Sequence, residues 1–493
     1  MAITGATNAV AAPSKQTLST NYIDFATAGS SDGWAQQYLP DLMEAEAEVF
    51  GNRTISGFLA QVGAEEGMQS DQVVWSEQGR LHLSYYATVA DINDITGGGG
   101  DSGGMTLNIT KNADGVASTD HGIRVNDTLI VATSGGTVRG LVESVTDGGI
   151  IDVLTYDYAT AEDAGIAAGT SNARVLVYGS EFGKGTDGRS SANAPAFKSY
   201  TNKPIILKDY YEISGSDASQ IGWIEVSGEE GQSGYMWYLK AAGDTRARFA
   251  DYMEMSMLEA VKPISGSIID NTASTGISQE AAGVQYGTEG LFAAIEARGN
   301  VTTGVTGVNA ATDLAEFDLI LAEFDKQGAI EENMMFVNRA TSLAMDDMLA
   351  SMNSYGAGGT SYGVFNNSED MALNLGFSGF RRGSYDFYKS DFRYLNDLST
   401  RGLINAVNST DAIRGVIIPA GTSSVYDQNL GKNMKRPFLH VRYRTSSVDD
   451  RKLKTWTTGS VGATTSGKDV MEMHMLSERC LVTQGANNFM LMK

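Results

Sequence analysis

Cysteine, histidine and proline are all scarce in this sequence of 493 residues, and each scarcity excludes a class of site or fold. The one cysteine, Cys480, cannot form an intramolecular disulfide or a cysteine-rich metal site. It lies in the strand-like run ERCLVTQ, which predicts a small buried hydrophobic side chain. The four histidines are few for a metalloenzyme. The seven prolines, against 57 glycines, favour glycine-containing loops in a β-rich protein over proline-rich disorder.

Long hydrophobic runs and a positive charge balance are missing as well. No stretch approaches about 18 uninterrupted apolar residues, so no membrane span is expected, and residues 1–21 show no apolar core of a signal peptide. Lysine and arginine total 36 against 59 aspartates and glutamates, which gives a net charge of −23. A protein this acidic is not expected to coat nucleic acid over its whole surface, although it could enclose nucleic acid without binding it.

The strongest periodic pattern in the sequence covers residues 235–262. Apolar or small residues recur there mostly at gaps of three and four, which places them on one side of an α-helix. These residues are Tyr235, Tyr238, Leu239, Ala242, Phe249, Tyr252, Met253, Ser256, Met257 and Ala260. Charged residues occupy the opposite face, and Asp244 and Arg248 are spaced to form an ion pair. Pro263 ends the predicted helix because proline lacks the N–H that another turn requires.

The rest of the chain predicts mixed α and β structure. Residues 1–38 predict an extended arm, and residues 73–75 and 81–86 are typical of a β-hairpin. Five short strand-like runs lie between two glycine-rich stretches, so residues 95–195 are predicted to form an inserted small β-barrel or sandwich. From residue 285 the pattern alternates between helix and strand, and the tail from Pro437 predicts strands.

Several patterns could carry chemistry, but none has the surroundings that its chemistry requires. Residues 359–363 match G-x-S-x-G, yet glycines rather than a strand precede Ser361, so a catalytic serine is not expected. Residues 179–185 resemble a phosphate-binding loop with one residue too few between the glycines. His121 beside Asp120, and His474 with Glu478, do not form a helical zinc-binding pair of histidines. We therefore expect no catalytic, cofactor-binding or metal-binding residues.

A basic run at residues 432–454 stands out in this acidic chain, with eight lysines and arginines against two aspartates. It could contact nucleic acid. The alternating run VRYR, however, places Arg442 and Arg444 on one face of a strand. Acidic residues of neighbouring subunits are therefore the favoured partners of this run.

Three phrases and the order of the predicted elements resemble a known family. The phrases are SDQVVWSEQGRLHLSYYATV, KPIILKDYYEISGSDASQIGW and YMWYLKAAGDTRARFADYMEMSML. They are similar to major capsid proteins of tailed bacteriophages and, more narrowly, of crAss-like phages. An extended arm, a short helix, a long two-stranded excursion with an insertion, a rod helix, an α/β lobe and a β tail follow one another. This order resembles the Hong Kong 97-type capsid fold over nearly the whole chain.

The resemblance implies an α+β Hong Kong 97-like fold with four parts. They are an N-terminal arm (1–64), an E-loop (65–225) containing the insertion at about 95–195, a peripheral domain (226–280 and 436–493) with a spine helix at 235–262, and an axial domain (281–435). It also implies a structural protein that self-assembles as hexamers and pentamers into an icosahedral shell enclosing double-stranded DNA. Portal and auxiliary or decoration proteins would be its partners. It would reside in the virion capsid after assembly in the host cytoplasm, with no cofactor and no membrane contact.

Two other classes of protein stay open on the sequence alone. One is another phage structural protein, such as a tail sheath, whose subunits also bury surface on their neighbours. The other is a polysaccharide-active enzyme that carries a β module. That enzyme would need a cleft with paired carboxylates, which a sequence cannot reveal.

Overall fold

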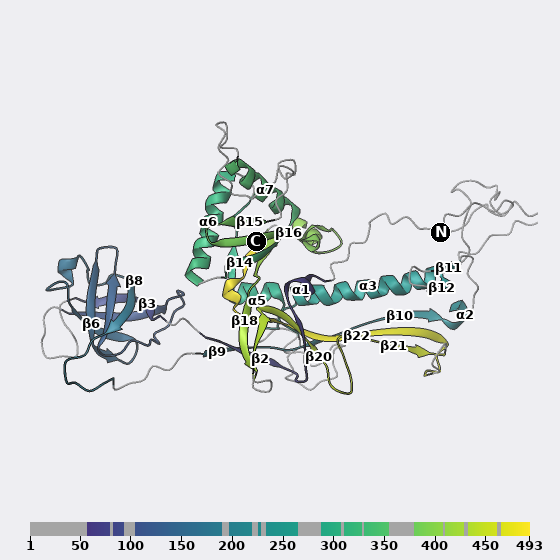
Figure 1. The fold of residues 1–493 in the computed structure, drawn as a ribbon, viewed down its shortest axis with the longest axis horizontal. Helices are drawn as coiled ribbons and strands as arrows, with labels where there is room; N and C mark the ends of the chain where they lie inside the picture. The colour runs from purple at the N-terminus through teal and green to yellow at the C-terminus, as the bar shows by residue number, and fades with distance from the viewer. Residues whose placement is uncertain are drawn as a thin grey trace, which may run out of the picture. The chain divides into compact units, whose positions relative to one another are not determined.

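The computed structural model describes residues 57–78, 82–92, 104–189, 197–218, 225–227, 233–264, 287–306, 310–327, 330–353, 379–407, 410–427, 432–460 and 465–493. The chain divides into two compact units, one of residues 74–201 and one of residues 1–73 with 202–493. Figure 1 labels the helices and strands of both units. The predicted arm at 1–38 lies outside the described residues.

The unit of residues 74–201 contains a closed antiparallel β-barrel (Figure 1). Its strands are β3 (Ser84–Asp91), β4 (Met105–Asn112), β5 (Asp127–Ala132), β6 (Thr137–Thr146), β7 (Ile150–Thr155) and β8 (Ala173–Ser180). They are hydrogen-bonded in the order β3-β4-β7-β6-β5-β8. Alternate side chains of each strand point inward, so residues such as Leu107, Leu129 and Ile151 are fully buried and fill the barrel.

The barrel has the small β architecture that the sequence predicted for residues 95–195, but that prediction left out its first strand, β3. The predicted hairpin of residues 73–75 with 81–86 is wrong, because β2 (Val73–Gln78) pairs with β9 (Phe197–Asn202) and β3 pairs with β4 and β8. The barrel therefore begins at Ser84, upstream of residue 95. The inward side chains of β3, Ala87 and Val89, are fully buried, so the barrel core depends on this strand.

We predict that a fragment of residues 82–189 folds alone, because it contains all strands of the closed barrel and their core. A fragment of residues 95–195 lacks β3, which leaves unpaired edges on β4 and β8 and opens the core to water. Circular dichroism during heating should show a cooperative transition for the first fragment alone. Equal unfolding behaviour of the two fragments would contradict this boundary.

The larger unit is built around the helix α3 (Met236–Glu259) and a five-stranded sheet (Figure 1). The strand β22 (Val470–Thr483) is central to this sheet. It pairs antiparallel with β10 (Ile205–Ser214) on one side and with β20 (Leu439–Arg444) and β21 (Lys454–Gly459) on the other. Parallel to β20 runs β1 (Glu65–Met68). Segments far apart in the sequence thus form one sheet.

The helix predicted at 235–262 is confirmed over residues 236–259, and three residues of its apolar stripe, Phe249, Met253 and Met257, are buried. Phe249 and Met253 pack against Met475 of β22 and Leu207 of β10. Tyr252 corrects the prediction, since its side chain is 45% exposed. It lies about 60° around the helix from Phe249, at the margin of the stripe, because each residue turns the helix by about 100°. The side chains of residues 235–241 lie outside the described ones.

The ion pair on the charged face of α3 also differs from the predicted one. Arg248 forms an ion pair with Asp209 of β10, with 3.3 Å between Nη2 and Oδ2, where the sequence predicted Asp244 as its partner. The sheet beneath the helix supplies this closer carboxylate, which spacing along the helix cannot indicate.

A six-stranded sheet forms the second layer of the larger unit. Its strands, in order, are β13 (Asn300–Thr302), β23 (Met490–Met492), β17 (Gly415–Pro419), β14 (Glu332–Val337), β16 (Tyr385–Asp391) and β15 (Gly379–Arg382). The helices α6 (Ala310–Gln327) and α7 (Arg339–Asn353) belong to this layer, and Phe317 and Phe324 of α6 share a buried cluster with Phe387 of β16. The alternating α/β pattern predicted from residue 285 is therefore confirmed.

Short elements complete the described chain. They are α1 (Phe58–Val62), η2 (Glu162–Ala164), α2 (Gly215–Ala218), β11 (Glu225–Ser227), β12 (Ser233–Tyr235), α5 (Leu291–Arg298), α8 (Arg393–Asn396), α9 (Arg401–Val407), β18 (Thr422–Asp427), β19 (Lys432–Pro437) and η4 (Ala486–Asn488).

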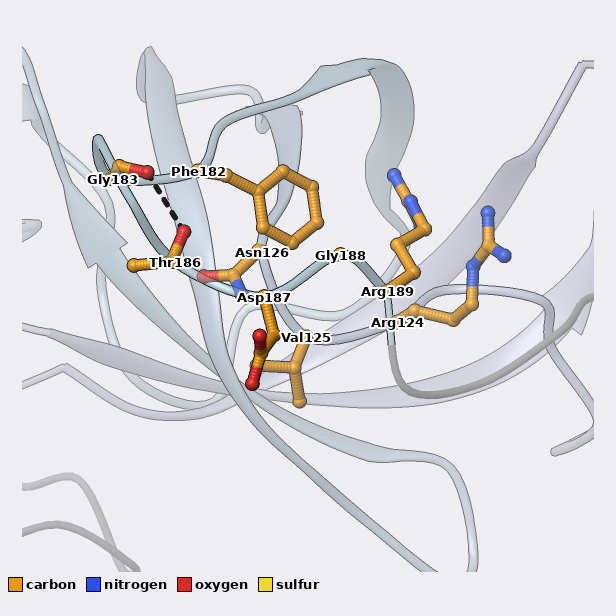
Figure 2. A pocket seen from close by; sticks show the side chains of 9 residues that line it. All are labelled: Arg124, Val125, Asn126, Phe182, Gly183, Thr186, Asp187, Gly188 and Arg189. Carbon is orange, nitrogen blue, oxygen red and sulfur yellow. Dashed lines mark hydrogen bonds between the residues drawn. The ribbon is translucent and has the colours of Figure 1, made fainter.

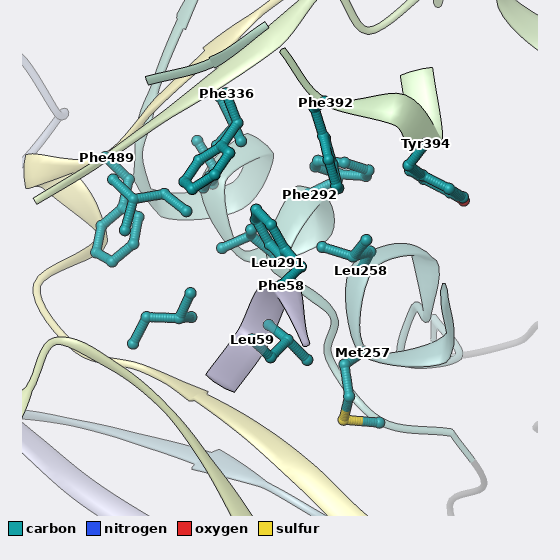
Figure 3. Close-up of a cluster of buried hydrophobic side chains, with 14 of the residues drawn as sticks. Phe58, Leu59, Met257, Leu258, Leu291, Phe292, Phe336, Phe392, Tyr394 and Phe489 are labelled. Atoms are coloured by element: carbon teal, nitrogen blue, oxygen red, sulfur yellow. The ribbon is translucent and has the colours of Figure 1, made fainter. Parts of the chain in front are cut away.

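One apolar cluster joins the two sheets of the larger unit, and Figure 3 shows part of it. Met257 and Leu258, at the end of α3, are fully buried in this cluster. Phe58 of α1 packs its ring between two others, 4.7 Å from Phe336 of β14 and 4.5 Å from Phe392, between ring centroids. The long helix and the second sheet are therefore held by the same core.

We predict that Phe249→Asp prevents folding. Loss of a buried phenylalanine costs about 3–5 kcal/mol, and burial of a carboxylate costs several more, against a typical domain stability of about 5–15 kcal/mol. Arg248→Ala is the matched control, because its exposed ion pair is worth about 0–1 kcal/mol. Soluble yield and circular dichroism compare the two variants. A Phe249→Asp protein that folds as well as the parent would show that this stripe is not buried.

Candidate functional site

The chemical patterns of the sequence do not come together as a reactive site in the described residues. Ser361 lies outside those residues. The run 179–185 ends β8 and continues into a loop, without the helix of a phosphate-binding loop. Glu478 forms an ion pair with Arg451, with 2.7 Å between Oε2 and Nε, while the His474 ring interacts with other side chains.

Among the described residues, no three histidine, cysteine, aspartate or glutamate side chains are grouped so that they could hold a metal ion. No helix within the described ranges is long and apolar enough to cross a membrane.

Cys480 and His121 have surroundings that explain them as structural residues. Cys480 is fully buried, as its strand-like run predicted, and burial raises the pKa of its thiol to about 12. Its reactive thiolate form is therefore rare at neutral pH. Burial also lowers the pKa of His121, whose Nδ1 accepts a hydrogen bond from the N–H of Ile123 at 3.2 Å.

A pocket of about 200 Å³ lies on the barrel unit, between the loop after β8 and the turn before β5 (Figure 2). Two guanidinium groups, of Arg124 and Arg189, line it and would attract an anion. However, Arg189 already pairs with the buried carboxylate of Asp127 at 2.5 Å, and the carboxylate of Asp187 lines the same pocket. The two arginines and the two aspartates therefore balance the local charge, which disfavours an anion in this pocket.

Arg442 and Arg444 of the basic run 432–454 form ion pairs inside their own chain, where the sequence favoured acidic residues of neighbouring subunits as partners. The side chains of residues 432–436 lie outside the described ones. Arg442 binds Glu66, with 3.0 Å between Nη2 and Oε2, and Arg444 binds Asp71. The parallel pairing of β1 with β20 places Glu66 directly beside Arg442. These partners are too far apart in the sequence for local patterns to reveal the pairs.

A buried carboxylate attaches α1 to the long helix. Glu254 of α3 is largely buried and accepts hydrogen bonds from the N–H groups of Gly57 and Leu59, at 3.0 and 3.2 Å. These N–H groups, at the start of α1, have no acceptor within the helix. Burial raises the pKa of Glu254, and the two hydrogen bonds and the Arg479 charge oppose this effect. Glu254 thereby holds the start of α1 against α3, next to the apolar cluster that joins the two sheets.

The sheet beneath α3 has a second, open face that carries a row of aromatic rings. Tyr210, His474 and Trp456 are direct neighbours across β10, β22 and β21. The His474 ring stacks on both others, with centroid distances of 5.8 Å to Tyr210 and 5.2 Å to Trp456. Tyr210 is 55% exposed and Trp456 is 37% exposed. Exposed aromatic rings on a rigid sheet are typical of a protein contact surface.

The sequence reading missed this aromatic row, although part of its signal was present. Residues 205–214 alternate between an α3-facing set and an exposed set, which places Tyr210 on the open face. The row itself depends on the register of three strands, and Tyr210 and His474 are far apart in the chain.

No protein-family model and no curated protein matches this chain. Solved structures are similar to it over nearly its whole length. The asymmetric unit of the bacteriophage PhiM1 mature capsid is 10% identical, with a TM-score of 0.36 and coverage of 94% of both chains. The capsid of a native GTA particle is 9% identical, with a TM-score of 0.37 and coverage of 95% of this chain and 99% of that one.

A third similar structure is the capsid of the cyanophage P-SCSP1u, at 8% identity and a TM-score of 0.40, with coverage of 96% of this chain and 98% of that one. All three are named as capsids.

We predict a specific pH response for Glu254→Gln. The folded-state pKa of Glu254 is raised above the ordinary 4.5, so its stability contribution is fully present below pH 4.5 and is lost as the pH rises through the folded value. The melting temperature of the parent relative to Glu254→Gln should therefore fall with rising pH in that window. Glu296→Gln, which changes an exposed carboxylate, should follow the parent. Parallel curves for the parent and Glu254→Gln would contradict the prediction.

Proposed function

We propose that this chain is the major capsid protein of a tailed double-stranded DNA bacteriophage, a structural subunit rather than an enzyme. The supporting observation is the arrangement of helices and sheets in the larger unit. A long helix lies on a sheet whose central strand comes from the end of the described chain, and one core joins both to a second α/β layer. This is the layout that the sequence resemblance implies for a Hong Kong 97-like subunit.

The proposed subdomains follow from this layout. The peripheral domain (226–280 and 436–493) holds α3 as its spine helix, with β22, β21 and β20. The axial domain (281–435) holds α6, α7 and most of the six-stranded sheet, which β23 completes. The E-loop (65–225) returns to the peripheral sheet as β10. The barrel, with its boundaries moved to 84–180, is proposed as an insertion exposed on the shell, and residues 1–64 as the arm.

Exposed apolar surface supports a role in assembly. Leu403, Ile404 and Val407 lie on one side of the short helix α9 and are all strongly exposed. The aromatic row on the open sheet face adds a second such surface. Apolar patches of this kind mark sites of protein contact. Copies of the same chain, in hexamers and pentamers, are the partners that a shell requires.

The acidic composition supports enclosure of DNA without sequence-specific binding, because a net charge of −23 repels the phosphate backbone. Portal and auxiliary or decoration proteins are proposed as further partners. The proposed location is the virion capsid, after assembly in the host cytoplasm.

We predict that the purified chain assembles by itself. Negative-stain electron microscopy over a range of protein and salt concentrations should show rings of subunits or closed shells. Raised salt should promote assembly, because it screens the repulsion between acidic subunits. Tubes would favour a sheath protein instead. A chain that stays monomeric under all conditions would contradict the proposal.

A further inference from the structure

Strand β10 forms one edge of the sheet beneath α3. It pairs with β22 along its whole length, from Ile205 to Ser214. Among the described residues, no strand pairs with its other side. At ten residues it exceeds the usual strand length of about five or six, and a long unprotected edge is a template for pairing with another chain.

The backbone groups of the even-numbered residues from 206 to 214 point away from the sheet. In an antiparallel sheet, successive residues direct their N–H and C=O groups to opposite sides. Asp469 accepts a hydrogen bond from Gly215, on the β10 side, and Val470 accepts one from Ser460, on the β21 side. With the register of β10 and β22, odd-numbered residues of β10 therefore bond β22, and even-numbered residues face outward.

The side chains along this edge are also available for contact with another chain. The N–H of Tyr210 donates to the carboxylate of Asp209, its own neighbour in the chain, at 2.9 Å. Lys208 is exposed and, within the described part of the chain, has no ion-pair partner. Glu212 pairs with Lys468 at 2.8 Å but keeps about a third of its side chain exposed. The edge thus offers one unpaired cation and one accessible carboxylate, four residues apart.

We propose that β10 pairs antiparallel with β10 of a second copy, around a two-fold axis through Tyr210. The proposal rests on the proposed function, in which copies of this chain assemble, and it names one of their contacts. The two sheets would merge into one continuous sheet across the axis, and the outward backbone groups of each strand would bond to the other strand. The N–H of Tyr210 would exchange its present acceptor, Asp209, for the C=O of the partner's Tyr210.

Charge complementarity selects this register. With Tyr210 opposite its own copy, Lys208 lies opposite Glu212 of the partner subunit, and this ion pair occurs twice around the axis. Cross-strand pairs of opposite charge are favourable, and like charges are unfavourable. Centring the axis on Lys208 or on Glu212 would oppose like charges. Intermediate registers place Lys208 opposite Tyr210 or Ser214 and leave it without a carboxylate.

The covered face of the sheet also accommodates this pairing. In the same register, Leu207 lies opposite Ile213 of the partner subunit, which extends the apolar surface beneath the helices. The helix α3 packs on both β10 and β22. With strands about 4.8 Å apart, the two copies of α3 would lie about 10 Å apart, close to the usual packing distance of about 8–10 Å. Tyr252, exposed in one copy, would lie near the second helix.

Cysteine cross-linking tests the axis directly. Tyr210→Cys places two thiols on residues whose Cα atoms are about 5.5 Å apart in a hydrogen-bonded pair, within disulfide range. Lys208→Cys is the matched control on the same face, because its two copies would be four residues, or about 14 Å, apart. The native Cys480 is buried and gives little background. Mild oxidation should cross-link most Tyr210→Cys chains into dimers and few Lys208→Cys chains.

Charge reversal provides a second test that needs no disulfide. Lys208→Glu replaces two ion pairs with two repulsive contacts and should raise the protein concentration needed for assembly about tenfold, equivalent to about 1.4 kcal/mol. The double variant Lys208→Glu with Glu212→Lys restores opposite charges across the axis and should recover most of this loss. Sedimentation and electron microscopy measure both effects. Because Glu212→Lys also removes the pair with Lys468 of the same chain, the melting temperatures of both variants are compared. A double variant that is as stable as Lys208→Glu but does not recover assembly would overturn the register.

The outcomes separate this contact from the proposed function. Shells without a Tyr210→Cys cross-link would overturn the two-fold contact and leave the capsid proposal standing. Cross-linked dimers that never form rings or shells would support the contact and contradict the capsid proposal. Equal cross-linking of Tyr210→Cys and Lys208→Cys would indicate random collision and overturn the contact. A protein that stays monomeric and uncross-linked would contradict both.

Discussion

Burial of the end of α3 is the constraint on which the larger unit depends. Met257 and Leu258 enter the apolar core that both sheets share, so the helix cannot leave its sheet without opening the second layer. Polar contacts fix the same end of the helix. Glu259, its last residue, accepts a hydrogen bond from Tyr394 at 2.8 Å and pairs with Arg401 at 2.6 Å. Packing and polar contacts together align the helix, the core and the segment of α8 and α9.

Several arginine side chains of this acidic protein form ion pairs with carboxylates of the same chain. Arg442 and Arg444 are neutralised by acidic residues of β1 and the turn that follows it, and Arg248 is neutralised by β10. Lys208 is an exception among the described residues, because it is exposed and without an ion pair. A charge left unpaired on an open strand edge is more informative about a contact surface than the number of ion pairs elsewhere, since exposed pairs contribute little to stability.

Element types could be predicted from the sequence wherever the signal was local and periodic. The helix at 236–259 and the alternating α/β segment from residue 285 follow from side-chain spacing, which burial on one side imposes. The false hairpin of residues 73–86 arose because two neighbouring strand-like runs suit either a hairpin or separate partners. The surface features, including the aromatic row and the free edge of β10, combine residues from separate strands, and local patterns could not reveal them.

The sequence by itself determined the long helix and the segments with regular side-chain spacing, that no cysteine framework exists, and that the chain is acidic, because these follow from composition and local spacing. Only the tertiary structure decided that β3 belongs to the barrel, that Glu66 neutralises Arg442, and that Tyr210, His474 and Trp456 form one row. The physical reason is that strand pairing depends on register and on cores completed by distant segments. These interactions join residues up to several hundred positions apart and leave no local periodicity.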